Sequence, residues 1–555
     1  MKKNICLVFT ALLFISYSCK TETSKKEVSE NKEIRQWKPE DTRSLTGLFD
    51  KRGLINDSEY DTQGYVLYEP SLGTFSYLMD KQGDIVHQWT ASLNSLNSYL
   101  MPNGHLFRLE RDENFPTFAA GGQAGRIREY DWDGNMVWDF KYFDEKKLLH
   151  HDFEIMPNGN ILAISYDAKS PEEAIAAGRD PKHIPKAGIW PDKVIEIRPT
   201  KPSGGEIVWE WKMWDHLIQD IDSSKANYGV ISDFPRKINI NVLGGEGGGP
   251  PMSDEQIKQM IKGGILTSNA SADNQGSDIS HFNSVNYNAD LDQIVVSVPN
   301  YGEIFIIDHS TTKEEAKGSS GGRWGHGGDL LYRWGNPKNY GQGTEEDQKL
   351  FGQHDVKWVP SDYPGEGNLM VFNNDILNPD SKFPNMFAAL AVAEFPEVKM
   401  SINDVGNYSS ILEFIPPINE NGEYLIPANQ AIGPETPSWG YTAPDKYSFY
   451  SAFMSGAQRL KNGNTLITQG MQGRIFEVTP ESEIVWDYLG PYMFNYKLPD
   501  GTPSQPVGPF IYGLFRSTLL TKDYPAFKGK DLKPISPQPE PFIFKMPPPE
   551  EVNEH

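Results

Sequence analysis

Three segments of the chain, MPNGHLFRL (residues 101–109), MPNGNILAI (156–164) and LKNGNTLIT (460–468), place an Asn-Gly pair between two apolar runs. Asn-Gly between alternating apolar residues is the strongest short-range signal for a β-hairpin, because both central residues of such a turn need a positive φ. Two weaker copies lie at residues 288–290 and 365–369. One hairpin is therefore repeated along the chain, with a period that varies because of insertions.

A second repeated element lies downstream of the hairpins and ends in an aromatic residue. A turn precedes a short apolar strand whose final Trp, Phe or Tyr is expected to pack between neighbouring sheets. The six copies are DKQGDIVHQW (80–89), DWDGNMVWDF (131–140), GGEIVWEW (204–211), GGDLLYRW (327–334), ESEIVWDY (481–488) and, in a weaker form, SSILEF (409–414).

Six units of about four short strands predict an all-β fold, namely a six-bladed β-propeller. Sheets of this size are not stable alone, and radial closure protects their edges. Residues 510–520 (FIYGLFRSTLL) are expected to supply the strand that closes the ring onto the first blade. Residues 223–280, 373–407 and 419–450 are expected to be loop insertions on one face, where long loops commonly carry function.

The composition excludes several classes of protein. The chain has 555 residues, with 52 Lys and Arg against 75 Asp and Glu, so its net charge is −23. Such acidity argues against a nucleic-acid partner, which needs clustered basic residues. Aromatic residues make up 12% of the chain, which is inconsistent with a disordered acidic protein.

The N-terminus, MKKNICLVFTALLFISYSC, has a basic start and an apolar stretch too short to span a bilayer. It resembles a bacterial lipoprotein signal that ends before a lipidated Cys19. The predicted organisation is a signal at 1–18, a tether at 19–60, the propeller at 61–525 and a Pro-rich tail at 526–555.

An ordinary secretory signal cleaved near Ser18 is the alternative. In either case we expect an exported protein, periplasmic or at the cell surface of a bacterium, and in the first case one held to a membrane by its lipid.

Three of the 11 histidines occupy equivalent places in the repeat, just before or within the strand that leads into the hairpin turn. They are His151, His281 and His354, and Ser455 takes this place in the sixth unit. Because the innermost strands of a propeller line its channel, we expect the three imidazoles to converge at one mouth. The other histidines lie outside this register and are expected to be structural or exposed.

The carboxylates that follow two of these histidines, Asp152 and Asp355, are expected to point away from the cluster, because neighbours in a strand alternate between faces.

Two chemistries suit three converging imidazoles. They could hold a metal ion such as zinc, with an open position for catalysis. Alternatively, one histidine is a nucleophile and the others donate hydrogen bonds to an oxyanion. The residues alone leave both chemistries open.

Four stretches carry a resemblance to the bacterial arylsulfate sulfotransferases of the PAPS-independent kind, which covers about residues 64–520. The stretches are SHFNSV (280–285), IVVSVPNYGEIFIIDH (294–309), LLYRWGNP (330–337) and FGQHDVKW (351–358). The resemblance implies a six-bladed periplasmic propeller that moves a sulfuryl group from a phenolic sulfate ester to a phenol, with no cofactor and no bound metal.

The resemblance also implies roles for individual residues. His354 takes the place of the family's nucleophile, which becomes a sulfohistidine in a ping-pong cycle. His281 and Asn283 match the His-x-Asn pair of the family, and His151 matches a further active-site histidine. Catalytic roles therefore fall on His354, His281 and His151, and a substrate-binding role falls on Asn283.

The sequence departs from the family at Pro299, where many members carry an arginine that contacts the sulfate. We expect Arg516 to substitute for it, and Ser455 to add a further substrate contact. Because of this departure, two other functions stay open: a metal-dependent propeller enzyme that uses the three histidines as ligands, and a non-catalytic propeller that only binds its partner.

Overall fold

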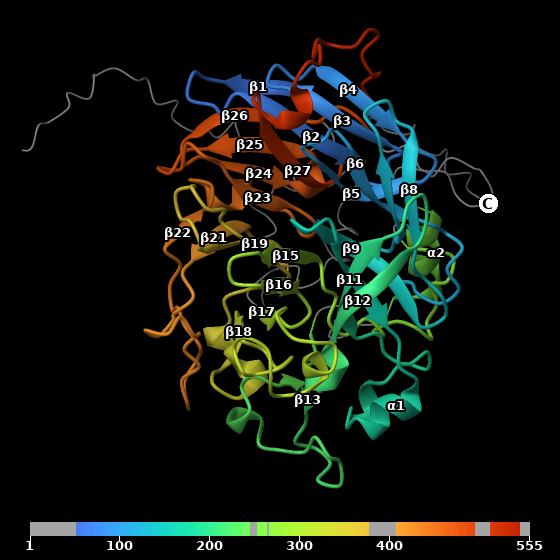
Figure 1. Cartoon of the computed structure of the whole chain (residues 1–555), viewed down its shortest axis with the longest axis vertical. Coiled ribbons are helices and arrows are strands. Elements are labelled where there is room, and N and C mark those ends of the chain that lie inside the picture. Colours follow the sequence, from blue (N-terminus) through green and yellow to red (C-terminus); the bar gives the residue numbers. More distant parts are fainter. Residues whose placement is uncertain (1–50, 245–251, 263–265, 377–406, 494–510, 544–555) are drawn as a thin grey trace, which may run out of the picture. The chain divides into compact units, whose positions relative to one another are not determined.

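The computed structural model describes residues 51–244, 252–262, 266–376, 407–493 and 511–543. Within them, six antiparallel sheets follow one another around a ring, from the blue strands through green to red (Figure 1). The predicted all-β, six-bladed propeller is therefore confirmed. The predicted signal, Cys19 and most of the tether lie outside the described residues.

Each blade is a sheet that runs from an innermost strand to an outer edge. In that order, blade 1 is β27 (Leu514–Thr521), β2 (Gly64–Pro70), β3 (Phe75–Asp80) and β4 (Ile85–Thr90); blade 2 is β5 (Asn94–Leu100), β6 (Leu106–Arg111), β7 (Gly125–Tyr130) and β8 (Met136–Lys141); blade 3 is β9 (Lys147–Ile155), β10 (Ile161–Asp167), β11 (Asp192–Pro199) and β12 (Gly205–Lys212); blade 4 is β15 (Ser284–Asn288), β16 (Gln293–Val298), β17 (Glu303–Asp308) and β18 (Tyr332–Trp334); blade 5 is β19 (His354–Trp358), β20 (Leu369–Asn373), β21 (Ser410–Phe414) and β22 (Trp439–Tyr441); blade 6 is β23 (Gly456–Arg459), β24 (Thr465–Gln469), β25 (Arg474–Val478), β26 (Ile484–Leu489) and β1 (Gly53–Asp57).

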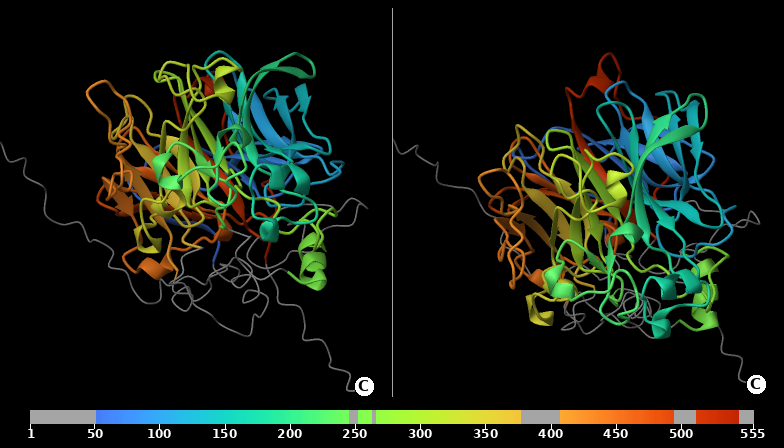
Figure 2. Two further views of the ribbon diagram at one scale, coloured as in Figure 1. Left: turned by 90° about the horizontal axis from the view of Figure 1, so that it is seen from below. Right: turned by 60° about the horizontal axis from the view of Figure 1, so that its bottom comes forward.

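The connections hold a parallel strand pair and several short helices. These are β13 (Leu217–Ile218) with β14 (Ile238–Asn239), the α-helices α1 (Pro171–Ala176) and α2 (Asp254–Lys262), and the 3-10 turns η2 (Pro181–His183), η3 (Met213–His216), η4 (Ile231–Asp233), η6 (Glu315–Lys317), η7 (Pro337–Tyr340), η8 (Glu345–Asp347), η9 (Lys446–Ser448), η10 (Gly470–Gln472) and η12 (Pro525–Phe527). Helices α1 and α2 lie on the same side of the ring of sheets (Figure 2). No helix within the described residues is long and apolar enough to cross a bilayer.

Both ends of the described chain take part in closing the ring. Strand β27, from the C-terminal part of the chain, pairs with β2 and becomes the innermost strand of blade 1. Strand β1, from the N-terminal part, pairs with β26 at the outer edge of blade 6. The prediction that residues 510–520 close the ring is confirmed for the described residues of that segment.

The repeated hairpin is the connection between the innermost and the second strand of a blade. All five predicted turns occupy this place, in blades 2 to 6. The predicted turn type is wrong, because only the glycine of each Asn-Gly pair has a positive φ, for example 86° at Gly104. The turn is centred one residue earlier, on Pro-Asn in MPNG and on Lys-Asn in LKNG, and closes with a 2.9 Å hydrogen bond from Gly104 N to Met101 O or from Gly463 N to Leu460 O.

A tryptophan on the fourth strand of every blade, which is the outer strand of blades 1 to 5, binds the next blade around the ring. Its indole N–H donates to a backbone carbonyl before the fourth strand of that next blade. The six bonds are Trp89 to Asp131 (3.2 Å), Trp138 to Gly204 (2.9 Å), Trp211 to Gly328 (2.7 Å), Trp334 to Pro434 (2.8 Å), Trp439 to Pro480 (2.9 Å) and Trp486 to Lys81 (2.8 Å).

This pattern corrects one expectation from the sequence. The segment SSILEF (409–414) is not an outer strand but forms β21, the third strand of blade 5. The outer strand is β22, which carries Trp439 and lies inside the predicted loop insertion at 419–450. A strand of three residues gives too short an apolar pattern to be recognised without its tryptophan.

The ring closure predicts unequal effects for two tryptophan variants. Trp486 is fully buried at the junction of blades 6 and 1, and the ammonium of Lys81 lies 3.9 Å above its ring. Trp486→Ala should lower the free energy of unfolding by about 3–5 kcal/mol, as is typical of a buried Trp-to-Ala change. Trp439→Ala, at a less buried site, should cost clearly less. Equal thermal shifts for the two purified variants would contradict the closure role.

Candidate active site

The structure brings His151, His281 and His354 together where the innermost strands begin. His151 is on β9, His281 lies three residues before β15, and His354 is the first residue of β19. The rings of His151 and His281 lie 4.4 Å apart, nearly perpendicular to each other. His354 is close enough to both for its charge to act on theirs.

Irregular backbone aims these side chains at one point. His151 and His281 have positive φ angles of 55° and 59°, and so does Asp355, at 58°. The pairing of β9 with β10 and of β19 with β20 shifts at these positions, which is the signature of a β-bulge. A bulge redirects a side chain, and strained φ angles of this kind concentrate at functional sites.

A glycine pair outside every motif recognised in the sequence makes room for the cluster. Gly122 accepts a 2.8 Å hydrogen bond from the backbone N–H of His151, and a Cβ at Gly122 would collide with the imidazole of His151. A Cβ at Gly121 would touch the ring of His281. Only glycine allows the backbone this close to the two rings.

The hydrogen bonds of His354 determine its tautomer. Nδ1 faces two oxygens, Oδ1 of Asn374 at 2.8 Å and the carbonyl of Gly352 at 3.1 Å. The Asn374 amide cannot be reversed, because its nitrogen donates to the carbonyls of Ser451 and Met454. The proton of His354 is therefore on Nδ1.

Nε2 of His354 consequently carries a lone pair. In this structure it accepts a 3.2 Å hydrogen bond from the backbone N–H of Met454. Burial, together with the nearby charge of His281, lowers the pKa of His354 to about 3, although the hydrogen bond to Asn374 opposes the shift. His354 is thus a neutral imidazole at neutral pH, with an unprotonated Nε2.

His281 has a carboxylate partner. Its Nδ1 lies 2.5 Å from Oδ2 of Asp278, which also accepts a 2.8 Å hydrogen bond from the hydroxyl of Tyr166. Burial alone would raise the pKa of Asp278, but His281, His150 and Tyr166 lower it below its ordinary value. A histidine held by an ionised carboxylate is oriented in the manner of a catalytic dyad.

His151 has a different kind of partner. Its Nδ1 lies 2.8 Å from Nδ1 of His150, whose Nε2 lies 2.7 Å from Oδ1 of Asp192. The sequence gives no reason to expect more than a structural role for His150, because it lies outside the repeated register. The signal that could reveal it is the His-His pair at 150–151.

The expectation that Asp152 and Asp355 stay out of the histidine cluster is consistent with their described contacts, which include no imidazole of the cluster. Arg516 of β27 lies between them, with Nη1 2.9 Å from Asp152 and Nε 3.0 Å from Asp355, so the three charges form one buried layer. Burial disfavours the guanidinium charge, but both carboxylates raise the pKa of Arg516 above its ordinary value.

The remaining predicted residues lie around this layer. Arg516 also contacts the hydroxyl of Tyr99 at 3.0 Å and the carbonyl of Asn283 at 3.5 Å. Asn283 donates from its amide nitrogen to the carbonyl of Gln353, and its buried Oδ1 has no hydrogen-bond partner among the described residues. The hydroxyl of Ser455 bonds Ser451 and the backbone N–H of Gly470. Substrate binding by these side chains stays a prediction.

Among the described residues, no group of three or more His, Cys, Asp or Glu side chains is arranged to hold a metal ion. Each imidazole of the cluster uses its Nδ1 for a protein partner.

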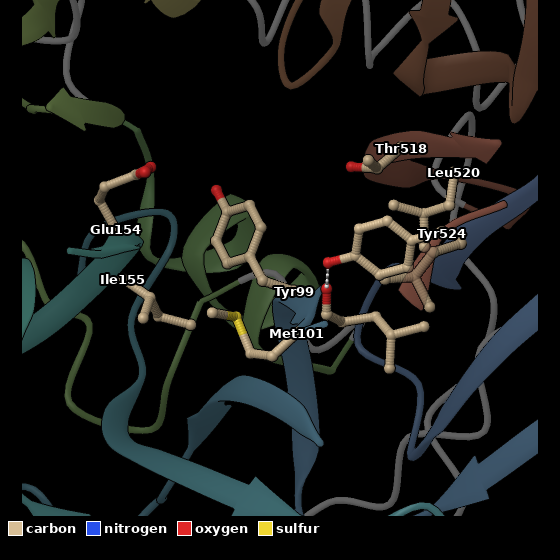
Figure 3. A pocket seen from close by; sticks show the side chains of 9 residues that line it. Tyr99, Met101, Glu154, Ile155, Thr518, Leu520 and Tyr524 are labelled. Atoms are coloured by element: carbon tan, nitrogen blue, oxygen red, sulfur yellow. Dashed lines mark hydrogen bonds between the residues drawn. The ribbon is translucent and has the colours of Figure 1, made fainter. Parts of the chain in front are cut away.

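A cavity of about 240 Å³ occupies the opposite end of the inner strands (Figure 3). Its lining comes from the last residues of β5, β9 and β27, and the carboxyl of Glu154 points into it. The hydroxyl of Tyr524 is held at its edge by a 2.7 Å bond to the carbonyl of Leu100. Burial, followed by the charge of Asp152, raises the pKa of Glu154 to about 8.

Because of this raised pKa, we expect the contribution of Glu154 to the free energy of unfolding to depend on pH. Between its ordinary pKa and about 8, Glu154 stays protonated in the folded state and ionises in the unfolded state, so folding loses stability as the pH rises. Glu154→Gln removes the ionisation. The thermal midpoint of the variant relative to the wild type should therefore be higher at pH 9 than at pH 5, whereas exposed Glu59→Gln should show no such difference. A Glu154→Gln effect that does not vary with pH would contradict the shifted ionisation.

Comparison with solved structures returns matches of low similarity. An uncharacterised protein from Bacteroides caccae is 10% identical, with 77% of this chain and 94% of that chain covered and a TM-score of 0.37. A virginiamycin B lyase from Staphylococcus aureus is 9% identical, with 79% and 88% covered and a TM-score of 0.31. A putative 6-phosphogluconolactonase from Bacteroides fragilis is 9% identical, with 84% and 100% covered and a TM-score of 0.34.

These likenesses are too weak to bear on function, and no curated protein matches the chain. The family comparison is informative. The model of the arylsulfotransferase family (ASST) matches residues 54–487, which is most of the chain and includes all three histidines of the cluster. This match confirms the resemblance seen in the sequence: the chain belongs to the arylsulfotransferase family.

Proposed function

We propose that this protein transfers a sulfuryl group from a phenolic sulfate ester to a phenol, through a covalent intermediate on Nε2 of His354. Membership of the arylsulfotransferase family supports sulfuryl transfer in general. The ping-pong course, the sulfohistidine and the independence from PAPS are the finer parts of the proposal.

The observation that carries the proposal is the fixed tautomer of His354. Two carbonyl oxygens hold the proton on Nδ1, and burial keeps the ring neutral, so Nε2 keeps a lone pair, which in this structure accepts a 3.2 Å hydrogen bond from Met454 N–H. A nucleophile benefits, because the ring becomes cationic when Nε2 is substituted, and both oxygens then stabilise the charge on Nδ1–H.

In the first half of the cycle, Nε2 attacks sulfur in line with the leaving oxygen. The N–S bond forms as the S–O bond to the aryl group breaks, and the phenolate leaves. His281 or His151 is placed to give the departing oxygen a proton as a general acid. In the second half, a new phenol attacks the sulfur, and the same histidine removes the phenol proton.

Charge on the three sulfuryl oxygens needs donors, because Pro299 supplies none in place of the family arginine. We propose that Asn283 and Arg516 serve this purpose, with Ser455 at the edge of the site. Among the described contacts of the Arg516 guanidinium, the longest joins Nη2 to the carbonyl of Asn283, at 3.5 Å. Nη2 is therefore the nitrogen that can most easily turn toward a sulfuryl oxygen.

The kinetic test uses 4-nitrophenyl sulfate as donor and phenol as acceptor. The wild type should release a burst of 4-nitrophenol equal to the enzyme and show ping-pong kinetics. His354→Ala should abolish the burst and lower turnover by at least about 10³-fold, as expected for loss of a nucleophile. His326→Ala, a partly exposed histidine outside the cluster, should retain both. A burst from folded His354→Ala would contradict the assignment.

We also propose that the protein is exported and anchored to a membrane by a lipid on Cys19. The support is the signal-like N-terminus with its basic start, short apolar stretch and cysteine. In bacterial cells making the full chain, the wild type should partition with membranes and incorporate labelled fatty acid. Cys19→Ala should lose the label and become soluble after export. A labelled Cys19→Ala protein would contradict the lipid site.

A further inference from the structure

Behind His151, a buried row of three titratable groups leads away from the site. Oδ1 of Asp192 is 2.7 Å from Nε2 of His150, and Nδ1 of His150 is 2.8 Å from Nδ1 of His151. Asp192 and His150 are completely buried, and His151 is 3% exposed. The proposed sulfuryl transfer so far gives no task to Asp192 or His150.

Asp192 is held as a hydrogen-bond acceptor. Its Oδ2 accepts from the hydroxyl of Ser280 at 2.7 Å and from the backbone N–H of Phe282 at 2.8 Å. Oδ2 is occupied by these two donors, so Oδ1 is the oxygen that faces Nε2 of His150. Burial raises the pKa of Asp192 and the charge of His150 opposes that shift, so an ionised Asp192 requires the proton of this contact to lie on Nε2 of His150.

The contact between the two Nδ1 atoms can hold only one proton. When His150 is neutral, its Nδ1 accepts from His151, and Nε2 of His151 has a lone pair. When His150 is an imidazolium, its Nδ1 donates to His151, and Nε2 of His151 carries the proton. The charge on His150 thus decides whether His151 is a base or an acid.

We propose that Asp192 and His150 are positioning residues that exchange a proton with His151 during the two halves of the cycle. This inference rests on the proposed sulfuryl transfer and assigns its acid and base to His151. As the donor's phenolate leaves, Nε2 of His151 gives up its proton, and Nδ1 of His151 takes one from Nδ1 of His150. As the acceptor phenol attacks, Nε2 gains the phenol proton, and Nδ1 returns its own to His150.

Each half exchanges one proton with the phenol and one between the two Nδ1 atoms, and the two halves together restore the starting state. The positive charge is held on His150, 2.7 Å from a carboxylate, rather than on His151. This placement suits the surroundings, since burial and the charges of His281, His150, His354 and Arg516 lower the pKa of His151 well below its ordinary value.

The groups that face His150 are consistent with this role. The ring of Tyr166 from β10 stacks on it at 3.8 Å, Asp192 comes from β11, and Asp278 adds a nearby negative charge. In the described part of the chain, the Nδ1 of His150 bonds His151, and its Nε2 lies at ion-pair distance from Asp192; neither partner is a Lys or Arg. His281, by contrast, is bound directly to Asp278.

The test compares donors that differ in leaving group. Nitrophenolate leaves without a proton, whereas the phenolate of phenyl sulfate needs one. His150→Gln should lower kcat/KM for phenyl sulfate by about 10²- to 10⁴-fold, the usual contribution of a general acid. For 4-nitrophenyl sulfate the loss should be less than about tenfold, because no general acid is needed there. The alkaline limb of the pH profile of kcat/KM with phenyl sulfate, which reports deprotonation of the acid, should disappear.

A second variant, Asp192→Asn, has nearly the same shape as the wild type and reverses the direction of the hydrogen bonds from residue 192 to His151. Its amide donates to Nε2 of His150, so the proton moves to Nδ1 of His150 and Nε2 of His151 is locked in the protonated form. The burst from 4-nitrophenyl sulfate should remain, whereas turnover with phenol should fall by about 10²-fold or more, because the base is lost.

Phe118→Leu is the packing control, because Phe118 is a buried ring that stacks on Tyr166 without a polar group. It should affect both donors equally. Two results would overturn the inference: equal losses for both donors in His150→Gln, or a turnover by Asp192→Asn that is as fast as its burst. If the wild type still shows a burst, the proposed transferase activity stands in either case. Absence of the wild-type burst would overturn the proposed function and this inference with it.

Discussion

The architecture depends on one hydrogen bond repeated around the ring, from an outer-strand indole N–H to a carbonyl in the next blade. Each bond ties the edge of one small sheet to a turn of its neighbour, so no blade has to be stable alone. The last bond, from Trp486 to Lys81, joins blade 6 to blade 1 and reinforces the closure made by β27 and β1. The channel in which the histidines meet exists because this ring closes.

Inside the ring, the inner strands are held in place by Arg516. Its contacts with Asp152 and Asp355 join blades 1, 3 and 5 across the channel, directly beneath the imidazoles. A charge bound between two buried carboxylates fixes three strands at once. The bulges that carry His151 and Asp355 are stabilised by this layer, so the strained backbone and the charged layer are two parts of one arrangement.

Much of the fold can be predicted from the sequence, because a propeller repeats its signals. The Asn-Gly turns and the aromatic strand ends each recur at equivalent places, and the misplaced outer strand is confined to blade 5. There the outer strand is three residues long and separated from β21 by a long connection, so the tryptophan at 439 is the one signal left. The predicted turn type fails because the turn starts one residue earlier, so that Asn is its third residue with a negative φ and only the closing Gly is positive, with or without a proline before Asn.

The site is predictable only in part, for a physical reason. His151, His281 and His354 share a register, and a register is visible in a sequence. Their partners are not, because the register does not mark Asn374, which follows β20, or the His150–Asp192 pair behind His151. The expectation that Asp152 and Asp355 stay out of the cluster is consistent with their described contacts, but their shared partner Arg516 on β27 is not visible in the repeat.

The central claim is that Nε2 of His354 becomes covalently sulfonated. The most direct measurement is to mix the protein with 4-nitrophenyl sulfate in the absence of acceptor, stop the reaction under alkaline conditions, and map the peptides by mass spectrometry. The account predicts one sulfuryl group per chain, located on His354 and lost when phenol is added before the reaction is stopped. A sulfuryl group on another residue, or a transfer reaction with no modified peptide, would contradict it.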